Sequence, residues 1–301
     1  MPHLTWNTGF QQVADRVFCY VTNGQTMMSN CLLVAGDECA LLFDVLCTKP
    51  MTREFLDECR RYTDKPIRYL VISHAHGDHF LGAAAVPEGA VVLGHPSLKP
   101  SFDQDLASGR AEGLKKRLPH LDWTDTTFPY PDIYLDGGCR IDLGGRTVDV
   151  MDMGQCHSAG DLALSIPDAK FMALADVLFY QVVPPTVSGD IDHWLDMLDA
   201  LEQSGAERFL PGHGPVCGRE GLAALKNYLL RVCAQARAVV DGKLELTDDV
   251  PSPLEAEMIR AGWLETARTL FSTEQYAARL RGVPYHAELT RILGLEKSRN
   301  G

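Results

Sequence analysis

The chain has 301 residues, of which 46% are hydrophobic and 23% are charged, and its formal net charge is -12. So acidic a chain repels phosphate backbones and anionic lipid headgroups, which excludes nucleic acid and membranes as expected partners. The N-terminus has neither a basic start nor an apolar run, and nine scattered cysteines without a Cys-x-x-Cys pair fit free thiols. We therefore expect a cytoplasmic protein with one large domain, or a domain and an appendage.

Apolar periodicity and turn residues divide the chain into strands and helices. Strands are expected at residues 17–21, 30–34, 39–44, 67–72, 91–94, 139–152 (two strands around Gly144-Gly145), 162–176 (two strands turning at 167–170) and 208–210. Helices are expected at residues 51–63, 80–85 (their first turns), 103–118, 193–205 and 221–240. A linker at 247–253 precedes a mostly helical tail, 254–295, which we expect to pack on the core, close a pocket or form a dimer contact.

One stretch concentrates groups that bind metals. His74-Ala75-His76-Gly77-Asp78-His79 follows the strand expected at 67–72 and precedes a predicted helix, so it lies on a strand-to-helix loop. Residues two apart on an extended backbone point the same way, which brings His74 and His76 together. Imidazole and carboxylate groups at this density suit a metal such as zinc.

This stretch matches the His-x-His-x-Asp-His motif, and the chain resembles the metallo-β-lactamase-fold superfamily. Three later segments resemble further ligand-bearing segments of that family, in family order: Gly154–Asp161, Leu174–Asp176 and Leu210–Pro215. The resemblance implies an α/β (αββα) sandwich of two mixed β-sheets flanked by helices. We expect the catalytic domain to span residues 1–244 and a C-terminal helical extension to span 245–301.

The resemblance also implies a pair of divalent metal ions, with zinc preferred and manganese or iron left open. His74, His76 and His157 would hold the first ion, and Asp78, His79 and His213 would hold the second. Asp176 would bridge the two ions together with a hydroxide. Asp78 would orient this nucleophile and carry its proton to the leaving group. Asp44 stands where the family places an aspartate that supports the metal loop.

The details favour one branch of the family. Asp176 and His79 are typical of thioesterases and lactonases, whereas β-lactamases proper generally lack the bridging carboxylate. Lactonases place a tyrosine three residues after that aspartate. Here this position is Phe179, and Tyr180 follows as the candidate to reach the oxyanion. We expect hydrolysis of a small ester, lactone or thioester; the alternatives are a β-lactamase-type amide hydrolase and a non-haem iron redox enzyme similar to sulfur dioxygenases.

Apolar and aromatic side chains from separate loops are the candidate pocket walls. They are Met27, Met28, Phe128, Tyr130, Phe179, Tyr180 and Trp194. A pocket of this kind would bury an apolar or aromatic acyl part and leave the carbonyl for the metals. Ordinary core packing is the alternative for several of them, and Cys156 is interpreted as a passive buried thiol. The expected partner is a small-molecule substrate, and homodimer formation is left open.

Overall fold

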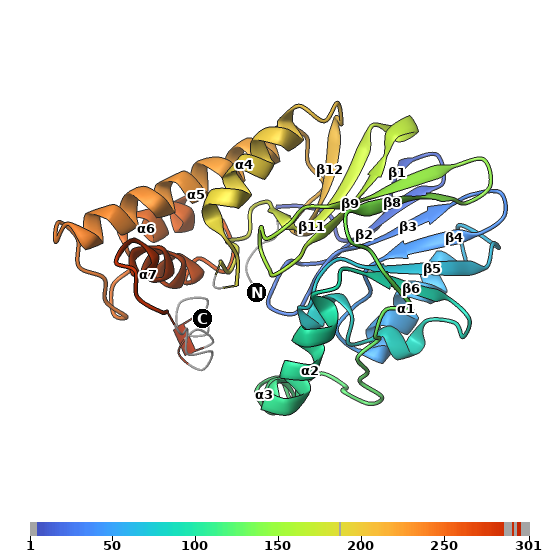
Figure 1. Cartoon of the computed structure of the whole chain (residues 1–301), viewed down its shortest axis with the longest axis horizontal. Coiled ribbons are helices and arrows are strands. Elements are labelled where there is room, and N and C mark those ends of the chain that lie inside the picture. Colours follow the sequence, from blue (N-terminus) through green and yellow to red (C-terminus); the bar gives the residue numbers. More distant parts are fainter. Residues whose placement is uncertain (1–4, 187, 286–290, 292–293, 296–301) are drawn as a thin grey trace.

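The protein is a sandwich of two stacked sheets with helices on both outer faces, as the computed structural model shows for residues 5–186, 188–285, 291 and 294–295 (Figure 1). The first sheet has the order β1-β2-β3-β4-β5-β6-β7 and the second the order β12-β11-β10-β9-β8. Both sheets are mixed: β4 to β7 pair in parallel in the first, and β11 pairs in parallel with β12 in the second. The predicted αββα sandwich is confirmed.

The strands of the first sheet are β1 (Gly9–Ala14), β2 (Val17–Val21), β3 (Cys31–Ala35), β4 (Ala40–Phe43), β5 (Ile67–Ile72), β6 (Val91–Gly94) and β7 (Ile133–Tyr134). Those of the second are β8 (Gly138–Asp142), β9 (Thr147–Asp152), β10 (Leu162–Ile166), β11 (Phe171–Phe179) and β12 (Arg208–His213). The helices are α1 (Lys49–Cys59), α2 (Leu98–Ser108), α3 (Arg110–Arg117), α4 (Ile191–Glu202), α5 (Arg219–Val240), α6 (Pro253–Arg260) and α7 (Arg268–Leu280).

Alternating side chains explain why the central strands are buried on both faces. In β3, Leu32 and Val34 enter the core between the two sheets, whereas Cys31 and Leu33 enter the core under α1 and α2. In the first part of β11 the same alternation sends Phe171, Ala173 and Ala175 between the sheets and Met172 and Leu174 toward α4 and α5. Such strands are continuous apolar runs, which is why the sequence located them well.

The C-terminal helices share the core of the second sheet. Leu254 and Met258 of α6 and Tyr276 of α7 belong to the same buried cluster as Trp194 of α4. Tyr276 also donates a 2.8 Å hydrogen bond to Asp192 at the start of α4. The tail therefore packs on the catalytic fold, while the domain boundary at residue 245 stays a prediction. Part of the tail, including residues 286–290, lies outside the described residues.

Two helix predictions are corrected by the structure. Residues 80–85 form no α-helix; short 3-10 turns at 77–79 and 83–85 replace it. The reason is tertiary: the Gly82 amide donates to the Leu46 carbonyl, and a Cβ on Gly82 would collide with the Thr48 carbonyl. The predicted helix 103–118 is two helices, α2 and α3, because Gly109 adopts a left-handed conformation with φ of 66° between them.

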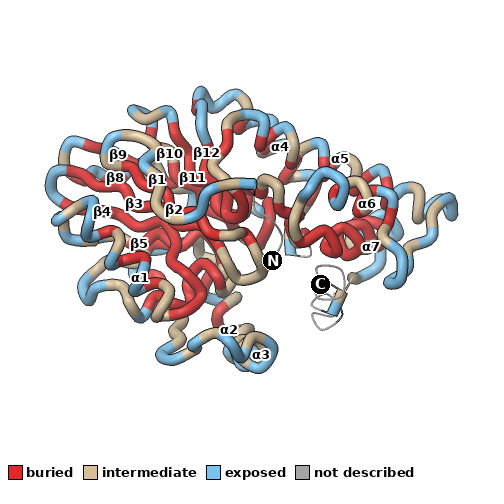
Figure 2. The backbone as a smooth tube through the Cα atoms, turned by 180° about the vertical axis from the view of Figure 1, so that it is seen from behind, coloured by how far each residue is buried: buried red, intermediate tan, exposed pale blue. Residues whose placement is uncertain are grey.

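The sequence interpretation missed two edge strands, β1 and β7. Residues of β1 are mostly half-buried, and β7 has only two residues, both exposed. Neither carries the apolar pattern that marks the central strands. Figure 2 shows the contrast between the buried sheets and the outer arm formed by α2 and α3.

Candidate metal centre

The seven predicted ligands meet at one edge of the sandwich, near the carboxyl ends of strands from both sheets. His74, His76, Asp78 and His79 follow β5, His157 follows β9, Asp176 lies in β11 and His213 ends β12. They form two groups, His74/His76/His157/Asp176 and Asp78/His79/His213, in each of which the ligand atoms lie within 4.8 Å of one another. All seven except His76 are buried.

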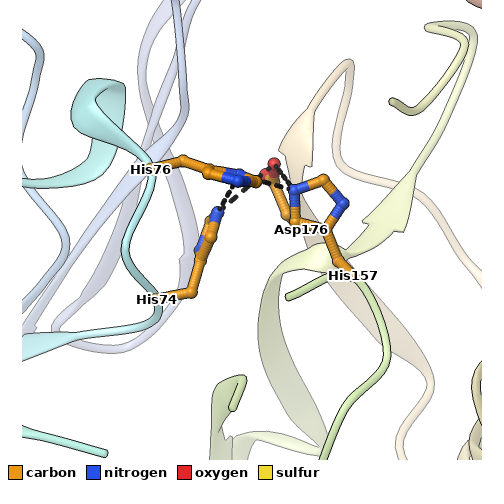
Figure 3. A group of neighbouring side chains, drawn as sticks. All are labelled: His74, His76, His157 and Asp176. Atoms are coloured by element: carbon orange, nitrogen blue, oxygen red, sulfur yellow. Dashed lines mark hydrogen bonds and ion pairs between the residues drawn. The ribbon is translucent and has the colours of Figure 1, made fainter. Parts of the chain in front are cut away.

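In the first group, the ring nitrogens and one carboxylate oxygen converge on a common point (Figure 3). The Nδ1 of His76 lies 3.0 Å from Nε2 of His74 and 2.8 Å from Nε2 of His157. The Oδ2 of Asp176 lies 3.1 Å from Nε2 of His157 and 3.6 Å from Nε2 of His74. Three imidazoles and a carboxylate in this arrangement offer four ligand atoms to one cation.

The second group uses the other oxygen of the same aspartate. The Oδ1 of Asp176 lies 3.2 Å from Nε2 of His79 and 3.5 Å from Nε2 of His213. Asp78 adds its Oδ2, which lies 3.3 Å from Nε2 of His213 and 3.8 Å from Nε2 of His79. Asp176 thus presents one oxygen to each group, as a carboxylate that bridges two metal ions must.

Some of the ligand atoms form no hydrogen bond with one another, and a pair of cations would satisfy them. Nε2 of His79 and Oδ1 of Asp176 are buried and lack a hydrogen bond of good geometry, although they lie 3.2 Å apart. An unsatisfied buried polar atom costs about 1–3 kcal/mol. A bound cation would satisfy both atoms at once, and nitrogen and oxygen ligands together suit zinc and its neighbours.

Burial and neighbouring charges set the protonation of the ligands. Burial lowers the pKa of His74 and that of His76 well below the usual range, and neighbouring cationic groups lower both further. For Asp78, burial alone would raise the pKa, but the charge of His79 and a hydrogen bond from His213 outweigh it and lower the pKa. Neutral imidazoles and ionised carboxylates are the forms that bind metals.

The surroundings of His79 favour a positive charge in the second ligand group. Burial alone would lower its pKa, but the carboxylates of Asp176, Asp78 and Asp44 outweigh burial and raise the pKa well above its usual range. Three carboxylates around one imidazole therefore favour a cation here. A metal ion supplies that charge once the imidazole is neutral.

Asp44 and Ser73 orient the imidazoles of the metal loop from behind. Asp44 Oδ2 lies 2.7 Å from Nδ1 of His79, and Ser73 Oγ lies 2.8 Å from Nδ1 of His74. Ser73 also donates its amide and hydroxyl to Asp44, each at 2.8 Å. These contacts occupy Nδ1 and direct Nε2 toward the metal position. Asp44 has a φ of 59°, a strained conformation typical of functional sites.

Asp161 and Asn30 fix the other two ligand loops, and the sequence interpretation gave neither a role. Asp161 accepts hydrogen bonds from the amides of His157 and Ser158, at 2.7 and 3.0 Å. Asn30 donates to the carbonyls of Pro211 and Gly214, at 2.9 and 2.8 Å, on either side of His213. An aspartate four residues after a histidine in a Ser- and Gly-containing loop was a usable signal for the first.

Close approach explains the glycine before His213. A Cβ on Gly212 would collide with Oδ1 of Asp176, so any other residue would displace the Asp176 carboxylate. The strand that carries Asp176 is also irregular, because Ala175 has a φ of 43° and the register shifts beside it. Such irregularities re-aim a side chain at a site.

A cavity of about 160 Å³ opens onto the ligands. Among the described residues, its apolar wall includes Met27, Phe80, Leu81, Leu114 and Phe128. Met27 and Phe128 are therefore placed as the sequence predicted. Arg110, on α3, and Arg268, on α7, also line it.

The other predicted pocket residues lie elsewhere. Phe179 and Trp194 are fully buried behind the ligands: the Phe179 ring stacks on His213, with centroids 5.1 Å apart, and Trp194 meets His157 edge-on. Met28, Tyr130 and Tyr180 are not among the described lining residues. The fully buried Phe179 and Trp194 are corrected as cavity-wall residues, whereas the substrate contacts predicted for Met28, Tyr130 and Tyr180 stay predictions.

Tyr180, the predicted oxyanion donor, packs beside helix α5. Tyr180 follows the last residue of β11, and its ring lies near Gly221 at the start of α5, against the same core cluster as Phe179. The Tyr130 hydroxyl donates to Asp103 on α2. Cys156 is a buried thiol whose Sγ contacts the Met153 carbonyl, as expected of a passive core residue.

A two-sheet sandwich that gathers two histidine and aspartate groups around one shared carboxylate defines a class of metal-dependent enzymes. The sequence model of the metallo-beta-lactamase superfamily matches residues 24–213. The chain belongs to this superfamily.

Curated relatives are distant. A 2,4-dinitroanisole O-demethylase subunit alpha from Nocardioides sp. (strain JS1661) is 21% identical over 188 residues, covering 60% of this chain and 51% of the relative. A Beta-lactamase-like protein 2 homolog from Caenorhabditis elegans is 24% identical over 155 residues, covering 51% of this chain and 44% of the relative. The chain thus spans about half the length of the curated relatives it matches.

Solved structures share the fold. A metallo-beta-lactamase from Pontibacter korlensis superposes with a TM-score of 0.60 at 20% identity, covering 74% of this chain and 99% of that protein. A stereoselective inverting sec-alkylsulfatase from Pseudomonas sp. gives a TM-score of 0.69 at 18% identity, covering 90% of this chain and 50% of that protein. None of the helices in the described ranges combines the length and apolar character needed to cross a membrane.

Proposed function

We propose that the protein is a hydrolase that uses two divalent metal ions, zinc by preference, to cleave a small ester, lactone or thioester with an apolar or aromatic acyl part. The observation that carries this proposal is the placement of Asp176, whose two carboxylate oxygens face the two ligand groups separately. When bound, two such ions supply an activated water near neutral pH and polarise the scissile carbonyl.

Asp78 is the candidate acid–base residue. It lines the cavity, is 8% exposed, and its lowered pKa keeps it ionised at neutral pH. It therefore begins the reaction ready to accept a proton from the attacking water and to deliver it to the leaving group. The hydrogen bond from Ser29 Oγ to the Asp78 carbonyl, at 2.6 Å, fixes the backbone that carries it.

The apolar wall supports an apolar acyl part. Met27, Leu81 and Phe128 border the same cavity as Asp78 and His213, so an acyl chain or ring beside them would leave its carbonyl near the metal ligands. A cavity of about 160 Å³ suits a small molecule rather than a polymer.

A substrate panel with purified, zinc-loaded protein tests this proposal. The panel contains chromogenic esters, lactones, thioesters, penicillins and carbapenems. An aryl methyl ether and an alkyl sulfate are added because the names of one curated relative and one structural neighbour point to those bonds. We expect apolar esters, lactones or thioesters to be turned over faster than any β-lactam. Efficient β-lactam hydrolysis with inert esters and lactones would overturn the proposed substrate class.

A further inference from the structure

A second cavity, of about 350 Å³, lies beside the first and shares His76, Asp105, Arg110 and Ser188 with it. We propose that Arg110 and this second cavity form a subsite for an anionic oxygen group on the substrate: a carboxylate, a sulfate or a phosphate. The inference rests on the proposed hydrolase and defines the kind of substrate that it selects.

The two cavities differ in chemistry. The first presents an apolar wall, whereas the second is bordered by hydrogen-bonding groups, among them Ser101, Gln104 and Ser188. His76, a predicted metal ligand, borders both. A substrate whose reacting bond lies at the metal centre would therefore place an apolar part in one cavity and a polar part in the other.

Arg110 stands where the two cavities meet and has donors to offer. Arg110 Nη1 lies 3.5 Å from Oδ1 of Asp105, at the outer limit of a hydrogen bond, and the Arg110 side chain is 46% exposed. A guanidinium carries five N–H donors in a planar fork. A carboxylate or sulfate that binds this fork with two oxygens would replace one long contact by two short ones.

The other arginine of the first cavity is used differently. Arg268 donates from Nη1 to the Val183 carbonyl at 3.2 Å and from Nη2 to Thr26 Oγ1 at 3.3 Å, and it lies 3.6 Å from Glu265. These contacts brace two loops of the cavity wall, and the residue is 7% exposed. Arg110 is thus the arginine suited to a ligand.

The negative charge of the whole chain makes a local cation favourable for binding an anionic substrate. With a formal net charge of -12, the protein repels anions at long range. Among the described residues of the second cavity, Arg110 supplies the guanidinium and Asp105 the carboxylate. An entering anion meets the guanidinium beside neutral hydroxyl and amide donors. The preferred substrate would then combine an apolar chain, a cleavable carbonyl and an anionic group.

Matched pairs of nitrophenyl esters test the subsite. 4-Nitrophenyl pentanoate has a neutral acyl chain, and mono-4-nitrophenyl glutarate has a chain of similar length that ends in a carboxylate. We expect wild-type kcat/KM to be about tenfold or more higher for the glutarate ester, mainly through KM, because a charge-assisted hydrogen bond has that order of strength. Arg110→Gln should lower kcat/KM for the glutarate ester by about tenfold more than for the pentanoate ester, so that the preference disappears. Arg110→Lys should restore part of it.

Lys116→Gln is the matched control, since it removes one positive charge from the exposed face of the same helix, away from both cavities. It should keep the preference. Equal kcat/KM for the two esters in wild type, or an equal loss on both in Arg110→Gln, would overturn the subsite.

A binding measurement separates this inference from the proposed hydrolase. Calorimetric titration of zinc-loaded protein with butyrate, butyl sulfate and butyl phosphate, in separate arms, identifies the preferred anion. Binding that weakens about tenfold or more in Arg110→Gln and not in Lys116→Gln supports the subsite even if no ester is turned over, in which case the hydrolase proposal alone fails. Binding that is unchanged by Arg110→Gln overturns the subsite whatever the activity.

Discussion

The metal centre and helix α3 face each other across one cavity and are built in opposite ways. Six of the seven ligands are buried, and their loops are tied down by Asp44, Asp161 and Asn30. No residue of α3 is buried, yet its Arg110, Ala111 and Leu114 line the cavity. The contrast teaches that the buried core holds the metal ligands in place, whereas the cavity wall formed by α3 lies outside the core.

The part of the cavity wall that α7 contributes is intermediate in burial between the metal ligands and α3. Arg268 joins α7 to the β2–β3 loop and to the segment after β11, and Gln275 contacts Thr186 and the Gly189 carbonyl. These contacts tie the tail to loops that border the cavity, including Ser188. The tail therefore shapes the cavity without contributing a metal ligand among its described residues.

The largest effect is expected from the carboxylate that joins the two ligand groups. Asp176→Ala removes an oxygen from each group, so metal content should fall from about two ions per chain to one or fewer, and ester hydrolysis should fall about a thousandfold or more. Elemental analysis and kcat/KM measure both. Asp168→Ala, at an exposed turn, is the control and should change neither. Full metal content and activity in Asp176→Ala would contradict the bridging role.

Asp78 separates proton transfer from metal binding. Asp78→Asn keeps the size and one oxygen but cannot accept the proton, so kcat should fall at least about a hundredfold while part of the metal stays bound. Steady-state kinetics at matched metal occupancy provide the measurement. Turnover near the wild-type level would remove Asp78 from proton transfer.

Asp44 tests how firmly the metal ligands are held, because it contacts the ligand His79 and is not itself a predicted ligand. Asp44→Asn should weaken metal binding by about 10- to 100-fold, since the imidazole loses the carboxylate that orients it. Competition with a chromogenic chelator measures this affinity. Asp37→Asn, at an exposed ion pair, serves as the control. Unchanged affinity in Asp44→Asn would show that packing alone orients His79.

Arg268 tests the part of the cavity wall that its own hydrogen bonds to Val183 and Thr26 hold together. Arg268→Met leaves the Val183 carbonyl and the Thr26 hydroxyl without this donor, so the free energy of unfolding should fall by about 1–3 kcal/mol and KM should rise. Denaturant unfolding and kinetics measure the two effects. Arg279→Met on the same helix loses ion pairs that are about half exposed and should cost about 0–1 kcal/mol. An equal cost for both variants would refute the special position of Arg268.

The smallest effect on stability is expected on α3. Leu114→Ala should change the free energy of unfolding by no more than about 0.5 kcal/mol, because the residue is not buried. It should raise KM for esters with long apolar acyl chains and leave short esters unaffected. Phe80→Ala, in the buried part of the same cavity wall, should cost about 3–5 kcal/mol. Comparable losses of stability in both variants would mean that α3 belongs to the core.

The ligand set was predictable from the sequence because its chemistry is local. His74, His76, Asp78 and His79 stand within six residues on one loop after a clearly apolar strand, and the resemblance supplied the other three positions in family order. The central strands were equally clear, since burial on both faces leaves continuous apolar runs.

The cavity walls were predictable only in part, at Met27 and Phe128, because aromatic bulk does not reveal which way a side chain points. Phe179 and Trp194 pack behind His213 and His157, and Tyr180 packs beside Gly221 of α5. Arg268 reaches Thr26 across 242 positions of sequence, a contact that no local pattern encodes. Arg110 lies on a charged helix of the kind that usually faces only solvent.

The metal content of the native protein tests the central claim most directly. Protein purified without chelator should contain about two divalent ions per chain, mainly zinc, as the two ligand groups around Asp176 require. Removal of the metal should abolish ester hydrolysis, and two equivalents of zinc should restore it. A content near one iron per chain, with no zinc and no recovery of hydrolysis on adding zinc, would contradict the account and favour the redox alternative.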